Sequence, residues 1–192
     1  HENIITYTRE SLVRPVVAFG STLYGTSAMN KTIKTLEEQG YSMVAGVNGS
    51  FFDRATGIPY GLVVTDSILR SGGTANAVGF YADGSAVIGD PELAVTLDHG
   101  DGSLALNYNK AMTKQNGVLL YSADYDTKTK NTLEGYHVIV RPVGGREAEL
   151  RLGQSVRVEV IGMAEDTKSC AIPDDGFLLA IANDTVYQTA LQ

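Results

Sequence analysis

Short apolar runs alternate with glycine-containing turn pairs along most of the chain. Asp-Gly, Asn-Gly and Gly-Gly pairs separate runs that are rich in Val, Ile and Tyr, the residues favoured in strands. Because such runs are too short for helices and are bounded by turn signals, they predict a protein made mainly of strands. The predicted strands lie at residues 15–19, 42–47, 61–65, 77–81, 85–88, 93–97, 104–108, 118–121, 136–141 and 155–161.

One segment, residues 29–39, has the spacing of an amphipathic helix. Ile33 and Leu36 fall on one face, and the other face carries Lys, Thr and Glu. Ser27 or Asn30 is the expected N-terminal cap, and Gly40 suits the left-handed residue that ends a helix. A weaker helical or turn segment is expected after residue 173. The predicted fold is a single α+β domain over residues 1–192, with a dominant, mainly β, mixed sheet and few helices.

Composition and charge narrow the class of protein. The 192 residues are 43% hydrophobic and carry a formal net charge of −7, so we expect a globular domain with an acidic surface rather than a nucleic-acid-binding protein. No apolar run reaches the roughly 20 residues that span a bilayer, so direct membrane insertion is not expected. The polar composition and the absence of an initiating Met favour an exported bacterial protein, extracellular or in the cell envelope, cut from a longer precursor.

The densest unusual stretch runs from residue 44 to residue 53, where an apolar run leads into Asn-Gly and two aromatic residues. Asn48 carries two donors and an acceptor, Gly49 permits close approach of a ligand, and Phe52 is suited to the wall of a sugar pocket. The alternative interpretation is an ordinary turn at Asn-Gly followed by two core phenylalanines. Taken alone, this stretch favours the alternative.

A second stretch, residues 59–73, is typical of a hairpin that ends in a loop rich in backbone donors. Arg70 and the N–H groups of residues 71–74 are candidates for binding an anion such as a phosphodiester. No Gly-Lys-Ser or Gly-Lys-Thr follows, so the loop is not a nucleotide-binding P-loop. An exposed arginine beside a flexible turn is the alternative.

The order of these motifs resembles the phosphodiester glycosidase family. Asn48-Gly49-Ser50-Phe51-Phe52 is followed by Gly61 with Val-Val-Thr-Asp, by Ser71-Gly72-Gly73 and by Asn76-Ala77, whereas the family has Asn-Gly-Gly-aromatic-Phe, a Gly with Val-Val-x-Asp, and Ser-Gly-Gly leading to Asn-Ala. Members include the lysosomal N-acetylglucosamine-1-phosphodiester α-N-acetylglucosaminidase and many bacterial envelope proteins. Here Ser50 replaces the second glycine.

The resemblance extends from about residue 44 to residue 179. Residues 116–122 are similar to an Asn-Gly-x-x-Leu-Tyr-Thr segment of bacterial members, and residues 172–179 to their Ile-Pro-x-x-Gly-x-x-Leu segment. Family members continue with Arg-Thr-Ala-x-Gly and Asn-Leu-Asp-Gly-Gly-Gly-Ser segments that this chain does not contain. We therefore expect an incomplete family domain, whose site needs the C-terminal remainder of a parent protein as its partner.

The resemblance implies a hydrolase that cleaves a sugar from a sugar-1-phosphodiester in a glycan or cell-envelope polymer. In this hypothesis Asn48 orients the substrate and Asp53 is the nominated acid or base. Other residues bind substrate, with Phe52 as a wall and the arginine loop at the phosphate. These are Gly49, Ser50, Phe52, Arg70, Ser71, Gly72, Gly73 and Asn76.

No cofactor and no metal site are expected, because the three histidines and the single cysteine show no metal-ligand spacing. Two alternative hypotheses, each from a different functional class, stay open. One is a carbohydrate-binding module without catalysis, in which the 10 tyrosines serve as stacking surfaces despite the absence of Trp. The other is a structural module of a larger envelope protein that keeps the family loops for folding.

Overall fold

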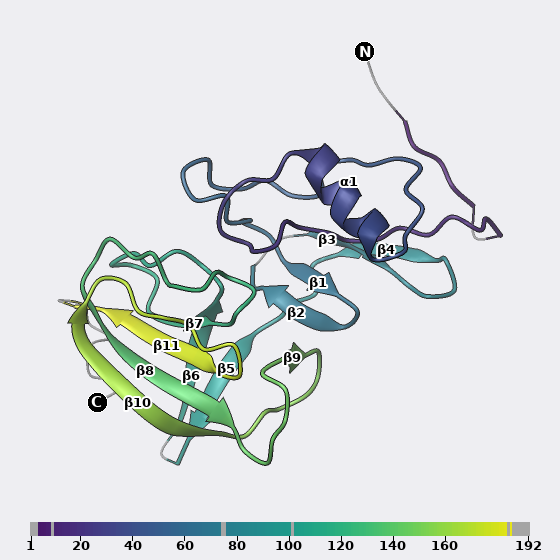
Figure 1. The fold of residues 1–192 in the computed structure, drawn as a ribbon. Coiled ribbons are helices and arrows are strands. Elements are labelled where there is room, and N and C mark those ends of the chain that lie inside the picture. The colour runs from purple at the N-terminus through teal and green to yellow at the C-terminus, as the bar shows by residue number, and fades with distance from the viewer. Residues whose placement is uncertain (1–3, 9, 74–75, 101, 184, 186–192) are drawn as a thin grey trace.

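The computed structural model describes residues 4–8, 10–73, 76–100, 102–183 and 185. Its main body is a six-stranded sheet with the order β10-β8-β11-β7-β6-β5 (Figure 1). Neighbouring strands are antiparallel except β6 and β7, which are parallel. The strands are β5 (Val95–His99), β6 (Gly102–Tyr108), β7 (Val118–Tyr121), β8 (Gly135–Pro142), β10 (Val158–Thr167) and β11 (Phe177–Ala182).

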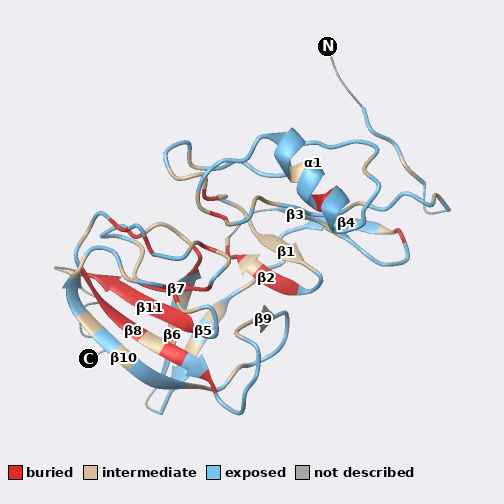
Figure 2. Ribbon diagram, in the orientation of Figure 1, coloured by how far each residue is buried: buried red, intermediate tan, exposed pale blue. Residues whose placement is uncertain are grey.

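The core lies on both faces of this sheet. Leu178, Ala180 and Ala182 of β11 pack into one hydrophobic cluster, whereas the alternate residues Phe177, Leu179 and Ile181 pack into another. Side chains alternate between the faces of a strand, so a strand covered on both faces is continuously apolar. All six residues of β11 are buried. Figure 2 shows burial concentrated in β7, β8 and β11, with β10 and the N-terminal part mostly exposed.

Two smaller sheets precede and flank the main one. β1 (Val63–Thr65) and β2 (Ile68–Ser71) form the predicted hairpin, and β9 (Leu150–Arg151) adds to β2. The hairpin turns at Asp66 and Ser67, whose φ angles of 53° and 64° are those of a turn that matches the twist of the flanking strands. β3 (Ala77–Phe80) and β4 (Ala86–Gly89) form a two-stranded ribbon.

The predicted helix is confirmed as α1 (Met29–Glu38), with Leu36 as its buried residue. Gly40, at a φ of 93°, adopts the left-handed conformation expected after the helix end. The predicted cap is wrong, because the residue at the N-cap is Ala28 and no side chain caps the first turn. The orphan N–H groups of this turn are therefore left without a side-chain partner in the described part of the chain.

The predicted strands are confirmed after residue 60 and wrong before it. The segments 15–19 and 42–47 have no regular secondary structure, and Val44 and Val47 are 72% and 78% exposed. A strand needs a hydrogen-bonded neighbour and a covered face, and neither segment has them among the described residues. β11 is a strand that the sequence analysis did not predict. A helical or turn segment was expected after residue 173, and the structure has a buried strand there, Phe177–Ala182.

The α+β fold class predicted from the sequence is therefore wrong, and the described structure is nearly all-β. The ten-residue α1 is the one α-helix in the described ranges, and its burial of Leu36 alone covers no face of the six-stranded sheet. Without a helical layer, the sheet covers itself by curling and by loops (Figure 1). No helix in the described part of the chain has the length and apolar character to cross a membrane.

Candidate functional site

An open pocket of about 420 Å³ lies where four segments converge. β2 contributes Arg70, the segment after β7 contributes Ser122 to Asp124, the loop before β9 contributes residues 145–149, and the turn before β11 contributes Asp174 and Asp175. Seven of these lining residues are charged, which makes the pocket polar and suited to a charged ligand. Arg70 is the sequence-predicted site residue that lines it.

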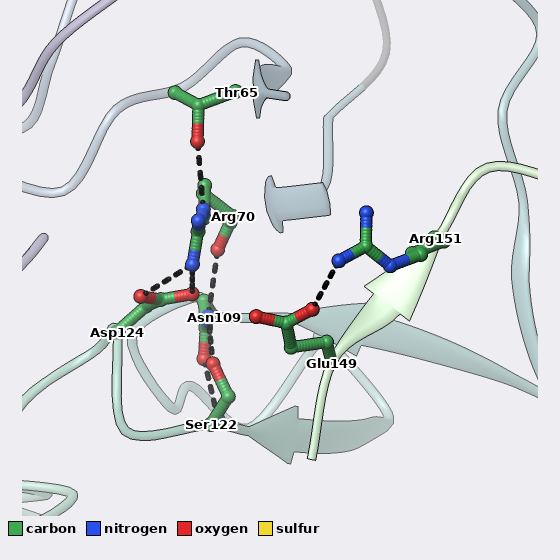
Figure 3. A network of polar contacts seen from close by, with 7 residues as sticks. All are labelled: Thr65, Arg70, Asn109, Ser122, Asp124, Glu149 and Arg151. Carbon is green, nitrogen blue, oxygen red and sulfur yellow. Dashed lines mark hydrogen bonds and ion pairs between the residues drawn. The ribbon is translucent and has the colours of Figure 1, made fainter. Parts of the chain in front are cut away.

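Arg70 is held in one orientation at the pocket wall. Its Nε donates to Thr65 Oγ1 at 2.8 Å, and its Nη1 lies 3.1 Å from both carboxylate oxygens of Asp124. The Arg70 and Asp124 side chains are 20% and 24% exposed, so water screens the pair less than it screens a surface ion pair. Figure 3 shows the guanidinium between Thr65 and Asp124. The hairpin β1–β2 therefore presents a fixed guanidinium to the pocket.

The backbone under Arg70 is fixed by a buried amide. Asn109 follows β6, is fully buried and has a left-handed φ of 52°. Its Nδ2 donates to the Arg70 carbonyl at 2.6 Å and to Ser122 Oγ at 2.9 Å, and its Oδ1 accepts from the Ser122 N–H at 2.9 Å. This side chain ties β2 to the ends of β6 and β7 (Figure 3). It satisfies polar groups that would otherwise be buried without partners.

Three of the five carboxylates that line the pocket already pair with arginines. Asp124 pairs with Arg70, Glu149 with Arg151 at 2.7 Å, and Asp175 accepts two contacts from Arg141, at 3.0 and 3.2 Å. Glu147 and Asp174 have no hydrogen-bond or ion-pair partner among the described residues, and neither does Arg146. The pocket thus offers two unpaired carboxyl groups beside an ordered guanidinium.

Beside the pocket, a lysine joins the loop before β1 to β2. Lys110 Nζ donates to the Pro59 carbonyl at 2.5 Å and to Ser71 Oγ at 2.9 Å, with the Tyr60 and Gly61 carbonyls at 3.4 Å. Burial lowers the pKa of Lys110 to about 8. The surrounding oxygens accept from an ammonium and so favour its protonated form at neutral pH.

Part of the predicted site comes together around Gly61. A Cβ on Gly61 would lie 3.1 Å from Ser50 Oγ, and a Cβ on Gly73 would lie 2.6 Å from the Gly61 carbonyl carbon. The loop with Ser50 and the loop with Ser71 to Gly73 therefore both lie next to Gly61. Ser71 and Gly72 are buried, and the Gly72 N–H donates to the Tyr108 carbonyl, so this N–H group is already occupied.

Other predicted residues lie away from the pocket. Asn48, Gly49 and Phe52 are exposed in the loop before β1, and Asn76 is exposed before β3. None of the four lines the pocket. Thr74, whose N–H was expected to help bind an anion, lies outside the described residues.

Asp53, the nominated acid or base, organises its own turn. Its Oδ1 accepts from the Ala55 N–H at 2.9 Å, the Thr56 N–H at 2.8 Å and Thr56 Oγ1 at 2.9 Å. The hydrogen bonds from Thr56 lower the pKa of this carboxyl, which keeps it ionised. A lowered pKa suits a structural carboxylate or a base more than a general acid.

Sequence reasoning missed Asn109, Lys110, Ser122 and Asp124. Each follows one of two predicted strands, and these strands, β6 and β7, pair in parallel. Their carboxyl ends therefore meet at one edge of the sheet, which is the usual location of sites in parallel pairs. Polar residues directly after two apolar strands were the signal, but their parallel pairing was not visible in the sequence.

The described residues contain no group of three or more His, Cys, Asp or Glu side chains placed to hold a metal ion. Five lining carboxylates are present, but three are committed to arginines.

Comparisons with known proteins give a fold and no family. No family model matches the chain, and no curated protein matches it. The chain is similar to the crystal structure of a hypothetical protein from Synechocystis, with a TM-score of 0.52 and 21% identity over 76% of this chain. The match covers 26% of that protein, so the chain spans about a quarter of its length. Likeness at this identity shows the fold alone, and the phosphodiester glycosidase resemblance stays a prediction.

Proposed function

We propose that this chain is part of a hydrolase of sugar-1-phosphodiesters that acts outside the cell or in the cell envelope on a glycan or envelope polymer, and that activity needs the C-terminal remainder of a longer protein. The observation that carries the proposal is Arg70, which the sequence of the loop at residues 59–73 assigns to the phosphate and which lines a pocket of about 420 Å³. A guanidinium has five N–H donors on three nitrogens, so protein groups can hold two of the nitrogens while the third donates to a phosphate oxygen. The ordered resemblance over residues 44–179 supplies the substrate class.

The reaction adds water across the bond between the sugar and the phosphate. Water attacks the anomeric carbon, the glycosidic C–O bond breaks, and the leaving phosphate oxygen takes a proton, which gives a free sugar and a phosphate monoester. Such a reaction needs one carboxyl group as acid and one as base. Glu147 and Asp174, the unpaired carboxyls in the pocket, are the proposed pair.

Because Asn48 does not line the pocket, its proposed role is to orient a part of the substrate that extends beyond it, whereas the acid–base role moves from Asp53 to the pocket. The reason is that Asp53 Oδ1 is occupied by three donors of its own turn. Arg70 binds the phosphate through its Nη2, which has no partner among the described residues. Asp124 and Thr65 hold the guanidinium in place for that contact.

A second candidate, a carbohydrate-binding module without catalysis, is favoured by two exposed aromatics. Phe51 and Tyr60 are 87% and 62% exposed, and the Tyr60 N–H donates to the Phe51 carbonyl at 3.0 Å. Hydrogen-bonded neighbours across a loop bring their side chains near each other, which makes a surface on which a sugar ring can stack.

The deciding experiment measures release of N-acetylglucosamine from an N-acetylglucosamine-1-phospho-sugar diester. The 192-residue chain is assayed alone and in any longer gene product that contains it. Arg70→Lys keeps the charge, but a single ammonium cannot contact Thr65, Asp124 and the phosphate in the same geometry, so we expect activity to fall by about 10²-fold or more. Asn48→Ala is expected to impair activity, and Arg54→Lys, on an exposed loop, is the matched control.

The outcomes separate the two candidates. Release that depends on Arg70 and not on Arg54 supports the hydrolase. Absence of release, together with glycan binding that Phe51→Ala abolishes, rejects the hydrolase and supports the binding module.

A further inference from the structure

Arg70 has N–H donors that no protein group occupies, but its positive charge is already paired with the Asp124 carboxylate. Thr65 and Asp124 occupy Nε and Nη1, whereas Nη2 has no hydrogen-bond partner in the described ranges. An anion that takes Nη2 therefore meets a guanidinium whose positive charge is offset by a carboxylate at 3.1 Å. At 24% exposure, that carboxylate is only partly screened by water.

The other residues that line the pocket add further negative charge around Arg70. Its lining carboxylates are Asp124, Glu147, Glu149, Asp174 and Asp175. Its lining cations are Arg70 and Arg146. With all five carboxyl groups ionised, Arg141 and Arg151, which pair with two of them from outside the lining, still leave one more negative than positive charge around the pocket; with the proposed acid protonated, the charges balance before the ligand binds.

We propose that Asp124 makes this pocket select singly charged phosphodiesters and reject doubly charged phosphate monoesters, an inference that rests on the proposed function. A diester carries one negative charge at every pH from 5 to 8, and the free Nη2 of Arg70 can donate to one of its oxygens. A monoester loses its second proton near pH 6, and the added charge then faces Asp124 and its neighbouring carboxylates.

The selection has a consequence for turnover. Hydrolysis converts a singly charged diester into an uncharged sugar and a monoester that becomes doubly charged above about pH 6. The same carboxylate that orients Arg70 for the substrate therefore disfavours the product. Product release is promoted by charge, without any movement of the protein.

The test compares α-N-acetylglucosamine-1-phosphate with its methyl phosphodiester, which share the sugar and differ in charge. Dissociation constants are measured by titration calorimetry at pH 5 and pH 8, and released N-acetylglucosamine is followed in the same samples. We expect the diester to bind equally at both pH values. The monoester is expected to bind about tenfold more weakly at pH 8 than at pH 5, the size of one like-charge contact at a partly exposed site.

Two variants assign the effect to Asp124. Asp124→Asn removes the charge and keeps a hydrogen-bond acceptor, so binding of the monoester is expected to lose most of its pH dependence and to become tighter relative to the diester. Glu149→Gln, which removes a lining charge that pairs with Arg151 and not with Arg70, is expected to change the ratio in the same direction by less. Glu165→Gln, on the exposed part of β10, is the control.

The inference is overturned if the wild-type protein binds the monoester at pH 8 as tightly as the diester, or binds neither. It is equally overturned if folded Asp124→Asn and Glu149→Gln leave the ratio of the two constants unchanged. Its failure is distinguishable from failure of the proposed function, because the hydrolase proposal fails when no N-acetylglucosamine is released, even if charge selection is intact.

Discussion

Single buried polar residues decide how well the candidate site is held. Asn109 makes three hydrogen bonds at full burial, whereas His137, on β8, is fully buried and makes no hydrogen bond through either ring nitrogen. Satisfied buried groups fix a structure, and unsatisfied ones cost free energy. Removing the Asn109 side chain is therefore expected to lower the stability of the fold, whereas an apolar replacement of His137 is not.

Replacing Asn109 by alanine is expected to destabilise the fold. The change leaves the Arg70 carbonyl and the Ser122 N–H without their partner and puts a Cβ-bearing residue without a stabilising amide at a φ of 52°. We expect the free energy of unfolding to fall by about 2–4 kcal/mol, measured by urea denaturation. Asn107→Ala, at an exposed position of β6, is the control and is expected to cost much less. Equal losses for the two variants would contradict the role of Asn109.

His137 predicts an acid-sensitive stability. Burial lowers its pKa from the ordinary 6.5, and the nearby Gly135 backbone opposes this only in part. The unfolded chain therefore binds a proton below pH 6.5 that the folded chain does not, so stability is present above this pH and is lost as the pH falls. One such proton changes the unfolding free energy by at most about 1.4 kcal/mol per pH unit.

We expect His137→Leu to remove this slope between about pH 6.5 and pH 5, above the range in which ordinary carboxyls titrate. The apolar replacement loses no hydrogen bond that the described structure contains, so stability at pH 7 is expected to hold or rise. His99→Gln, at the exposed end of β5, is expected to keep the slope. Unfolding curves at several pH values check this, and an unchanged slope in His137→Leu would reject the assignment.

At the scale of elements, the sequence predicts a strand correctly where the folded chain supplies a partner strand. It fails where an apolar run finds no partner, because the run alone does not show this. β7 was predicted at its observed bounds, Val118–Tyr121, because a run of four apolar residues between turn signals is too short for a helix and fits a buried strand. The run at residues 42–47 has the same pattern but no partner strand among the described residues. Arg70 was identified from its loop, yet Asp124, 54 residues later, was not, because no local pattern joins them.

The loop before β1 depends on a contact that no sequence pattern indicated. Lys110 is the group that ties the carbonyls of residues 59–61 to Ser71. Lys110→Met keeps most of the packing of the stem and removes the donors. We expect amide hydrogen exchange in residues 50–61 to accelerate, with little change in β8 and β11, because a local tether and not the core is lost.

The pH dependence of this tether has a defined direction. Since the pKa of Lys110 is lowered to about 8, the ammonium loses its proton as the pH rises through 8, and fewer donors remain for four acceptors. Exchange in the wild-type loop, corrected for the intrinsic pH effect, is expected to approach that of Lys110→Met above pH 8. Lys114→Met, in the segment between β6 and β7, is the control. A loop that exchanges identically in wild type and Lys110→Met would contradict the tether.

At the scale of the whole molecule, burial is uneven. The six-stranded sheet holds two buried clusters, whereas exposed large apolar residues gather in the N-terminal part and on β10. Val160 and Met163 on β10 are 61% and 65% exposed, and this ten-residue strand is at an edge of the sheet. A long edge strand with apolar side chains is a template for pairing with another chain.

Acidic side chains on β10 oppose the pairing of this edge with another copy of the chain. Glu159, Glu165 and Asp166 lie on β10 in a chain whose formal net charge is −7, so like charges oppose pairing between copies. Screening by salt weakens this repulsion. Self-association through β10 is therefore expected to increase with protein concentration and with salt.

Val160→Glu adds a charge near the N-terminal end of this edge strand and is expected to lower the weight-average mass in sedimentation velocity at high salt. Leu152→Glu is the matched control, because Leu152 is 46% exposed but lies outside the strands, where a charge does not interrupt backbone pairing. If association is a general effect of exposed apolar surface, both variants reduce it equally. If it is strand pairing at β10, Val160→Glu alone reduces it, since a pairing edge is sensitive to a charge on the edge and indifferent to one elsewhere.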